Sequence, residues 1–178
     1  KPLAAALLVL LQASCASAQA EQRPEEPSTE AQRRHIEQLV QQITQRRADT
    51  QFCLGYDAML AGEWERALRH LRLTKGLAPD SIRTRCHLLK CLYELDRREA
   101  FEREAAALEK AEPRCAPPKL YRGEFYVREG KHDEALAQYV ALLEIEEPIC
   151  TEGLTESLQE AVKICIKRND ILKAMRFS

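Results

Sequence analysis

Apolar residues recur every three or four positions over most of this chain, and short segments with glycine or proline separate the stretches that carry them. In one such stretch Ile36 is followed by Leu39, Val40 and Ile43, which places all four on one face of a helix. The turn residues return at regular intervals. This pattern predicts amphipathic helices joined by short turns.

The first amphipathic stretch is predicted to form a helix over residues 30–47. Thr29 offers an N-cap, and Gln32 completes a capping box three residues later. The apolar stripe of this helix is narrow, and arginine, glutamate and glutamine fill the rest of its surface. Two roles remain open. The helix covers the end of the helices that follow it, or it pairs with a second copy of the chain.

A short motif occurs twice further along the chain. Gly62-Glu-Trp-Glu-Arg-Ala67 returns as Gly130-Lys-His-Asp-Glu-Ala135, 68 residues later, and Gly55 returns as Gly123 at the same interval. Prolines also recur, at intervals of 34 and 35 residues: Pro79, Pro113 and Pro148. Because 68 is twice 34, these coincidences predict three helix-turn-helix units in register, over residues 48–81, 82–115 and 116–149.

The three units resemble the tetratricopeptide repeat (TPR) family, whose period is 34 residues. The first helix of that repeat carries W-x2-L-G-x2-Y and the second carries A-x3-F. The middle unit matches least, with Leu88 and Leu92 in its first helix and Ala100 or Phe101 in place of the expected alanine. The outer units keep parts of both patterns: Leu54-Gly55, Ala67-x3-Leu71, Gly123-x2-Tyr126 and Ala135-x3-Tyr139.

The resemblance implies an all-α fold, a right-handed superhelical array of antiparallel helix-turn-helix repeats. Small residues at the repeated positions are expected to let neighbouring helices lie close together: Gly55, Gly123, Ala67 and Ala135. Gly62 and Gly130 are expected to end the first helices in the left-handed conformation. Trp64 is expected to fill the gap between helices rather than to stack on a ligand.

After Pro148 the helical pattern continues, so residues 150–178 are predicted to form a partial fourth unit or a C-terminal cap. Ala174 takes the place that Ala135 has in the third unit. Apolar residues at helical spacing mark the first helix of this segment: Leu154, Leu158, Ala161, Val162, Cys165 and Ile166.

Residues 1–20 have the layout of a secretory signal peptide. Lys1 supplies a positive charge, nine apolar residues run from Leu3 to Leu11, and Ala16-Ser-Ala18 or Ala18-Gln-Ala20 offers a cleavage site. The apolar run is well short of the ~20 residues that span a bilayer, so no membrane span is expected. The chain is therefore expected to be exported to the periplasm, the envelope or the exterior, with the ER lumen as the alternative.

Two features adjoin this segment. Leu11-Gln-Ala-Ser-Cys15 resembles a bacterial lipoprotein signal, which makes Cys15 an alternative site of lipidation, although Gln12 departs from the preferred aliphatic residue. Residues 21–29 contain two prolines, four charges and no aliphatic residue, and they are predicted to form a flexible linker.

Six cysteines follow the predicted leader, and an even number in an exported protein suggests disulfides. We expect at least one bridge, with Cys86–Cys115 as the first candidate because these residues flank one antiparallel helix pair. The other interpretation is that the cysteines are small core residues. The candidates are Cys53, Cys86, Cys91, Cys115, Cys150 and Cys165.

Charge and motifs argue against several function classes. The chain has 27 basic and 28 acidic residues, so no charge excess favours nucleic acid. Neither a nucleophile constellation nor a glycine-rich phosphate loop nor an HExxH motif occurs in the sequence. Cys86-His87-x3-Cys91 comes nearest to a metal site, but zinc requires four ligands. We therefore expect no enzymatic activity, no metal and no cofactor.

The resemblance also implies that a protein or peptide binds in a concave groove lined by the first helix of each unit. A groove with mixed aromatic, apolar and singly charged residues suits an amphipathic segment. Met59 and Val127 in particular are equally consistent with the core. By family logic the groove carries Phe52, Tyr56, Met59, Cys86, Lys90, Tyr93, Leu120, Glu124, Val127 and Arg128.

Some TPR domains hold the acidic tails of cytosolic heat-shock chaperones with a clamp of lysine, asparagine and arginine. The corresponding places here carry other residues: Phe52, Tyr56, His87, Pro117 and Tyr121. We therefore expect a non-enzymatic protein–protein interaction scaffold of the cell envelope or secretory space. The alternatives are a chaperone-like, client-binding protein of the ER lumen and a structural, self-associating module, and the oligomeric state stays open.

Overall fold

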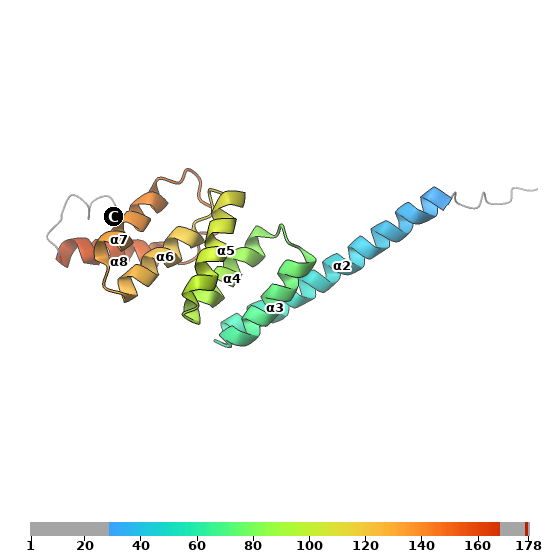
Figure 1. Ribbon diagram of the computed structural model, residues 1–178, viewed down its shortest axis with the longest axis horizontal. Helices are drawn as coiled ribbons and strands as arrows, with labels where there is room; N and C mark the ends of the chain where they lie inside the picture. The colour runs from blue at the N-terminus through green and yellow to red at the C-terminus, as the bar shows by residue number, and fades with distance from the viewer. Residues whose placement is uncertain (1–28, 168–176, 178) are drawn as a thin grey trace, which may run out of the picture. The chain divides into compact units, whose positions relative to one another are not determined.

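The computed structural model describes residues 29–167 and residue 177. The predicted leader, Cys15 and the predicted linker up to residue 28 lie outside these residues. The chain divides into two compact units, residues 1–41 and 42–178. The described part of the first unit is the start of one helix. The described part of the second unit contains the end of that helix and six more (Figure 1).

Every element in the described part of the chain is helical, which confirms the predicted all-α class. The helices are α2 (Thr29–Leu60), α3 (Trp64–Leu77), α4 (Ile82–Glu94), α5 (Arg98–Ala111), α6 (Pro117–Arg128), α7 (His132–Leu143) and α8 (Leu154–Lys167). None of them is long and apolar enough to cross a membrane.

The first helix differs from the expected one in length. A separate helix was predicted over residues 30–47, but α2 continues without interruption to Leu60. The sequence between residues 44 and 50 contains neither glycine nor proline, so nothing there breaks the helix. The first half of the first repeat is therefore the end of a 32-residue helix.

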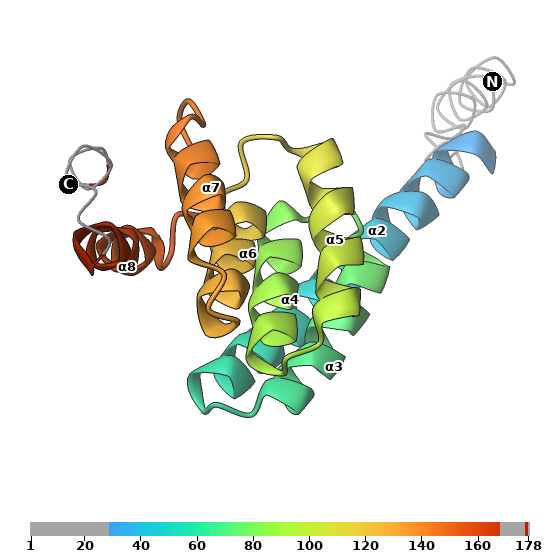
Figure 2. The same cartoon turned by 60° about the vertical axis from the view of Figure 1, so that its left-hand side comes forward.

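The helices of the second unit pack as successive pairs. Helix α4 contacts α3, α5 and α6, and helix α6 contacts α5, α7 and α8 (Figure 2). A turn of three residues joins the two helices within each of the three predicted repeats. This is the stacking of helix-turn-helix units that the sequence period predicted.

Two glycines in the first helices allow the close packing that we expected of them. A Cβ atom built on Gly123 would lie 2.5 Å from Cε1 of Tyr139, and one built on Gly55 would lie 3.0 Å from Cγ of Leu71. Tyr139 has no exposed surface, so its ring has little freedom to move aside. The glycines are therefore needed for contact between the two helices of a repeat.

The turn after each first helix uses one residue in the left-handed conformation. Gly62 and Gly130 have φ angles of 73° and 71°, as predicted. The middle repeat has Asp96 at the equivalent position, with φ 54°. Aspartate tolerates this region better than most residues, which explains how the turn is kept where the sequence pattern is weakest.

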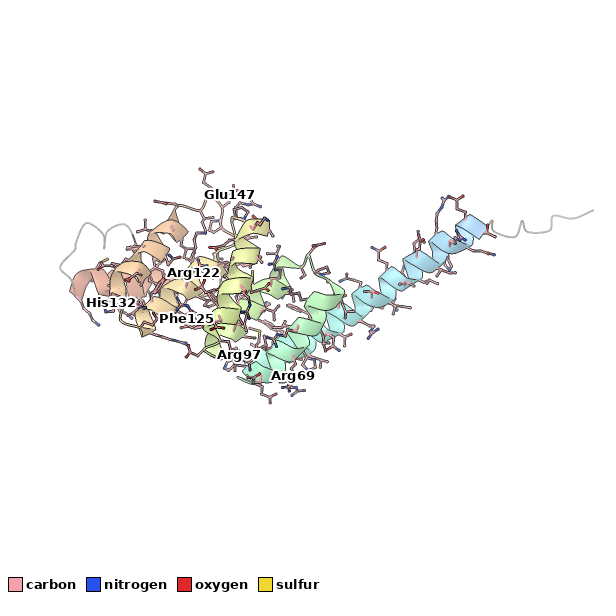
Figure 3. The ribbon with its side chains drawn as sticks, in the orientation of Figure 1. Arg69, Arg97, Arg122, Phe125, His132 and Glu147 are labelled. Carbon is pink, nitrogen blue, oxygen red and sulfur yellow. The ribbon has the colours of Figure 1, made fainter. Side chains whose placement is uncertain are left out.

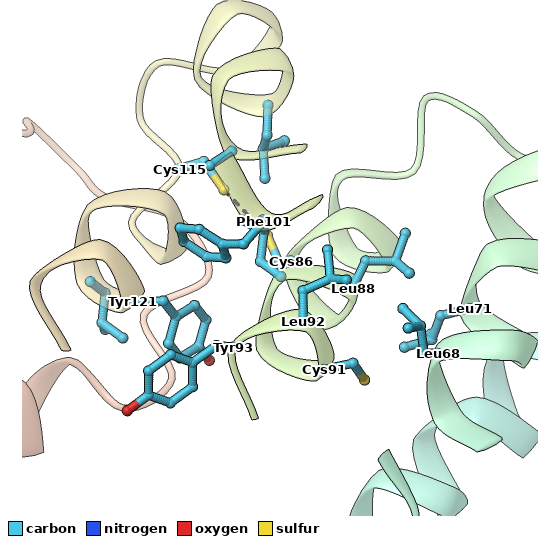
Figure 4. Packing of buried hydrophobic residues seen from close by; sticks show 14 of the residues in the cluster. Leu68, Leu71, Cys86, Leu88, Cys91, Leu92, Tyr93, Phe101, Cys115 and Tyr121 are labelled. Carbon is cyan, nitrogen blue, oxygen red and sulfur yellow. Dashed lines mark hydrogen bonds between the residues drawn. The ribbon is translucent and has the colours of Figure 1, made fainter. Parts of the chain in front are cut away.

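Two clusters of buried side chains form the core. The larger cluster lies among α3, α4, α5 and α6 and includes Leu68, Leu89 and Phe101 (Figure 4), and Trp64 packs against it as expected. The smaller cluster joins α7 to α8 and the end of the chain: Ala135, Leu136, Tyr139, Ala161, Ile164, Cys165 and Phe177. The array is thus stabilised by two adjoining cores.

Candidate binding groove

Aromatic rings from α2 and α4 form the first part of the surface on which we place the candidate site. The rings of Phe52 and Tyr56 are stacked with centroids 6.2 Å apart, and each centroid lies 5.4 Å from that of the His87 ring. The guanidinium of Arg83 lies 4.7 Å above the Phe52 ring. This cluster joins the first helices of two successive repeats.

A second aromatic group joins α4 to α6. The rings of Tyr93 and Tyr121 are stacked at 5.1 Å, as Figure 4 shows, and the Phe125 ring lies edge-on to Tyr93. Arg128 covers the Tyr93 ring at 3.8 Å and donates a hydrogen bond to the Tyr93 carbonyl oxygen. The first helices of the second and third repeats are therefore joined in the same way.

A cavity of about 310 Å³ opens between these two groups. Helix α4, the start of α6 and the segment before α8 all contribute to its wall. Its lining residues are Arg83, Cys86, His87, Pro117, Tyr121, Cys150 and Glu152. The wall is mostly apolar, with one basic and one acidic side chain among its charged groups, so the cavity suits an apolar side chain with a polar flank.

The pKa values of two cavity residues, His87 and Tyr121, are shifted so that their neutral forms are favoured. Burial is the main reason that the pKa of His87 is lowered, and the charges of Arg83 and Lys90 act in the same direction against the opposing charge of Glu152. Burial likewise raises the pKa of Tyr121. A neutral imidazole and a neutral phenol can both donate and accept hydrogen bonds.

Glu124 connects the groove to the following helix. Its carboxylate accepts hydrogen bonds from the Tyr93 hydroxyl at 2.9 Å and from the Ser157 hydroxyl at 2.5 Å. These donors lie on α4 and α8, so one side chain of α6 links three helices. Glu124 holds the groove in shape as well as facing it.

The structure brings together only part of the predicted groove. Phe52, Tyr56, Lys90 and Glu124 are partly exposed, and Arg128 is exposed beside Tyr93. The remaining members need correction. Met59 and Leu120 belong to the larger core cluster and have almost no exposed surface, and Val127 packs against the smaller cluster. These three side chains are left out of the groove. Tyr93 is also nearly buried, and it adjoins the groove only through its ring contacts with Tyr121 and Arg128.

The predicted groove set contained only Cys86 of the seven residues that line the cavity. His87, Pro117 and Tyr121 had been considered only as positions of the chaperone clamp, and three others had not been considered for the groove at all. Arg83 lies one helical turn before His87 on α4, so the helical period could have indicated it. Cys150 and Glu152 follow the third repeat and belong to no first helix, so the resemblance to the family could not have indicated them. They reach the cavity because the segment around Ile149 pairs with residues 114–116.

The thiols of Cys86, Cys115 and Cys150 lie beside the cavity, with all three sulfur atoms within 4.8 Å of one another. The expected Cys86–Cys115 disulfide is absent: their sulfur atoms are 3.2 Å apart, against about 2.05 Å for a bond. The hydrogen bond between these thiols raises the pKa of Cys86 and lowers that of Cys115, and burial raises the pKa of Cys150.

Two more of the described cysteines are also free thiols: Cys53 and Cys91. Cys53 is exposed, whereas Cys91 lies in the larger core and Cys165 in the smaller one. Cys86-His87-x3-Cys91, the sequence that came nearest to a metal site, does not form a ligand cluster: Cys91 is absent from the one group of close metal-binding side chains in the described residues.

A larger hollow, of about 530 Å³, lies between α2 and α3. Its lining includes the exposed aliphatic residues Ile43 and Leu73 together with Arg46, Arg47 and Arg72. No partly buried ring, carboxylate or thiol lines it. We therefore place the candidate site in the smaller cavity, where aromatic, charged and thiol groups converge.

Comparison with known proteins identifies the fold. No protein-family model and no curated protein matches the sequence. Among solved structures, the TPR domain of Arabidopsis OM64 matches with a TM-score of 0.57 and 16% identity, over 70% of this chain and 98% of that one. MamA matches with a TM-score of 0.56 and 18% identity, over 73% of each chain.

Pseudomonas aeruginosa pilF matches with a TM-score of 0.58 and 15% identity, over 75% of this chain and 59% of that one. At such identities the likeness shows the fold alone. It confirms the predicted class, a superhelical array of TPR-like helix pairs.

Proposed function

We propose that this protein is a non-enzymatic scaffold that binds a segment of a partner protein in the groove formed by α2, α4 and α6. One observation carries the proposal: aromatic rings and cations from successive first helices surround a cavity of about 310 Å³. Aromatic residues and arginine are the side chains most often found where binding energy concentrates.

The lining favours an amphipathic segment as the ligand. An apolar side chain of the partner would enter the cavity beside Pro117 and Tyr121, while its polar flank would meet Arg83, Lys90 or Glu152. Cations of the groove are already placed over rings, as Arg83 is over Phe52. A strongly acidic tail is therefore a poorer ligand than a mixed one.

The setting is part of the same proposal. The apolar run and cleavage sites of residues 1–20 favour export to the cell envelope or the secretory space, with the ER lumen as the alternative. This setting would be supported if the intact mass of exported protein corresponds to a chain that begins after Ala18 or Ala20. Exported protein that retains Lys1 would contradict it.

The binding proposal is tested by crosslinking in cells from a photoreactive residue at position 83, followed by mass spectrometry. The captured partner is then titrated against the purified chain by calorimetry. Arg83→Glu should weaken binding at least about tenfold, because we place Arg83 at the centre of the site, where loss of a hot-spot side chain costs about 2 kcal/mol or more.

Arg69→Glu is the matched control, because Arg69 is an exposed arginine of α3 outside the cavity (Figure 3). Binding to this variant should equal that of the wild type. Equal binding to both variants would place the partner on another surface. Similar affinity for many unrelated apolar peptides would favour the chaperone-like alternative.

Self-association is a second candidate function, favoured by one observation on α2. Ile36, Leu39, Val40 and Ile43 are each between 43% and 58% exposed, although they share one helix face. Light scattering tests it with Leu39→Gln and Val40→Gln combined. A smaller mass than that of the wild type would support pairing, provided that Leu60→Gln on the same helix leaves the mass unchanged. A monomeric wild type would exclude it.

A further inference from the structure

Three cysteines from three different segments meet beside the groove. Cys86 lies in the second turn of α4, Cys115 lies between α5 and α6, and Cys150 lies between α7 and α8. All three sulfur atoms are within 4.8 Å of one another, and Cys86 and Cys115 are buried. The cluster therefore has a defined centre that faces the cavity on one side.

Backbone contacts hold two of these segments together. The amide of Ala116 donates a hydrogen bond to the Ile149 carbonyl at 3.1 Å, and the amide of Ile149 donates one to the Arg114 carbonyl at 3.0 Å. This short bridge aligns two equivalent points of successive repeats, because Cys115 and Cys150 each follow a repeat proline by two residues. The meeting of the thiols thus results from main-chain pairing.

The backbone of Cys150 is in a conformation that a cysteine rarely adopts. Its φ angle is 57°, in the left-handed region that favours glycine. Such a residue costs about 1–3 kcal/mol and persists where the surroundings impose it, often at functional sites. Cys150 directly follows Ile149 of the bridge, and in this conformation its sulfur lies within 4.8 Å of the other two.

We propose that Cys86, Cys115 and Cys150 bind one thiophilic metal ion, Cu(I) or Zn(II), as three thiolates. An ion about 2.3 Å from each of three sulfur atoms places those atoms about 3.8–4.0 Å apart. The observed spread, from 3.2 Å to at most 4.8 Å, includes these values. Thiolate ligands select such soft ions over Mg(II) or Ca(II).

The two candidate ions differ in whether they need a fourth ligand. His87 is engaged with the rings of Phe52 and Tyr56 and does not belong to the group of close ligand atoms. Cu(I) is satisfied by three thiolates, whereas Zn(II) takes a fourth ligand. Water in the adjoining cavity would supply that ligand.

The test uses the full chain, reduced and freed of metal under anaerobic conditions. Cu(I) is titrated in competition with a chromophoric chelator, and Co(II) serves as the spectroscopic probe for the Zn(II) site. The wild type should bind one equivalent. A site of the Zn(II) type is identified if the Co(II) form shows thiolate-to-cobalt absorption in the near ultraviolet and the visible bands of tetrahedral Co(II). A three-coordinate site is identified if Cu(I) binds tightly and Co(II) does not.

Single substitutions decide whether the cluster is responsible. Cys150→Ser is the decisive variant because Cys150 is partly exposed, so the chain should keep its helical circular dichroism. It should bind at least about 100-fold more weakly, since even the loss of an outer-shell partner costs about 10–100-fold. Cys86→Ser and Cys115→Ser should behave alike, and Cys53→Ser, at an exposed site, should bind as the wild type does.

Two results would overturn the proposal. One is the absence of stoichiometric binding by either ion. The other is binding that Cys150→Ser leaves unchanged. The proposal does not depend on a protein partner, so it can fail or stand separately from the proposed groove function.

Discussion

Gly123 and Gly55 occupy equivalent positions in two repeats but tolerate a methyl group differently. Gly123→Ala should lower the free energy of unfolding by about 1–3 kcal/mol, because its Cβ would lie 2.5 Å from the buried Tyr139 ring. At Gly55 the nearest atom is Cγ of the buried Leu71 at 3.0 Å, so the neighbour has to give way by only a few tenths of an ångström. There the helix-propensity gain of about 1 kcal/mol should offset much of this smaller clash, so Gly55→Ala should cost less than Gly123→Ala.

Urea denaturation of both variants measures this difference. Gly55→Ala is the control, because it makes the same chemical change on the same kind of helix. A Gly123→Ala variant as stable as Gly55→Ala would show that the Tyr139 ring moves without cost.

At the residue scale, the sequence predicted where the turns lie better than it predicted which residues form the turns and the groove. The period of 34 places the left-handed turn residue at 62, 96 and 130, and the structure has positive φ angles at all three. Yet Asp96 could not be recognised from the motif, since the match there was poor. Conversely, Met59, Tyr93 and Leu120 have the helical spacing of groove residues and are buried, because a helix packed on two sides has no single apolar face.

Charged groups join neighbouring helices on the other side of the repeats. Glu104 of α5 accepts hydrogen bonds from Lys75 of α3 at 2.5 Å and from Arg85 of α4 at 2.8 Å. Arg122 of α6 (labelled in Figure 3) forms ion pairs with Glu102 and Glu109 of α5. These ion pairs link successive repeats. The spacing of residue types along the sequence does not indicate them, because the paired residues are up to 29 positions apart.

The Glu104 contacts should make stability depend on pH. Burial alone would raise the pKa of Glu104, but hydrogen bonds and charges from Lys75 and Arg85 outweigh burial and hold the pKa below its ordinary value of 4.5. A carboxyl whose pKa is lower in the folded state stabilises it above the unfolded pKa, and this contribution is lost as pH falls below about 4.5.

Glu104→Gln should therefore lower the free energy of unfolding by about 1–2 kcal/mol at pH 7, and by less at pH 3. Urea denaturation at the two pH values measures both differences. Glu63→Gln provides the control: its ion pair with Arg66 is half-exposed, so the change should cost at most about 0.5 kcal/mol. An equal loss at pH 7 and pH 3 for Glu104→Gln would show that the charge itself contributes nothing.

The largest difference between predicted and observed elements concerns α2. Its predicted cap at Thr29 adjoins residues outside the described part of the chain and stays a prediction, and no signal marks the end of the helix before Gly62. The repeat motif suggested a boundary near residue 47 only because the family unit begins there. A repeat period defines where equivalent residues lie, whereas glycine, proline and caps define where a helix ends.

At the scale of the whole array, the two hydrophobic clusters should respond separately to mutation. Phe177, the last described residue, is buried in the smaller cluster with Tyr139 and Ile164. In repeat proteins each unit contacts only its neighbours, so stability is roughly a sum of local terms. Damage to the smaller cluster should therefore leave the larger one folded.

Phe177→Ala tests this expectation. Loss of a buried phenylalanine costs about 3 kcal/mol or more, so amide hydrogens of α8 should exchange about 100-fold faster. Those of α4 and α5 should exchange at the wild-type rate, as measured by hydrogen-exchange mass spectrometry. Uniformly faster exchange in all helices would show instead that the second unit of the chain unfolds as one cooperative body.

Fold and site differ in how far the sequence predicts them. The fold follows from local patterns that repeat, so the period, the turns and the packing glycines suffice. The cavity instead combines α4 and α6 with the segment around Cys150 and Glu152. That segment is positioned by the main-chain bridge between Cys115 and Ile149, which no residue pattern encodes.

The three-cysteine cluster has a consequence for how this gene can change. Arrays of repeats commonly gain or lose whole units during evolution, because each unit stacks equally well on any similar neighbour. Here Cys86, Cys115 and Cys150 meet only if consecutive repeats follow one another without interruption. Inserting a unit after Cys115 would preserve the stacking but would carry Cys150 away from Cys86, so the number of repeats in this stretch cannot drift without dismantling the cluster.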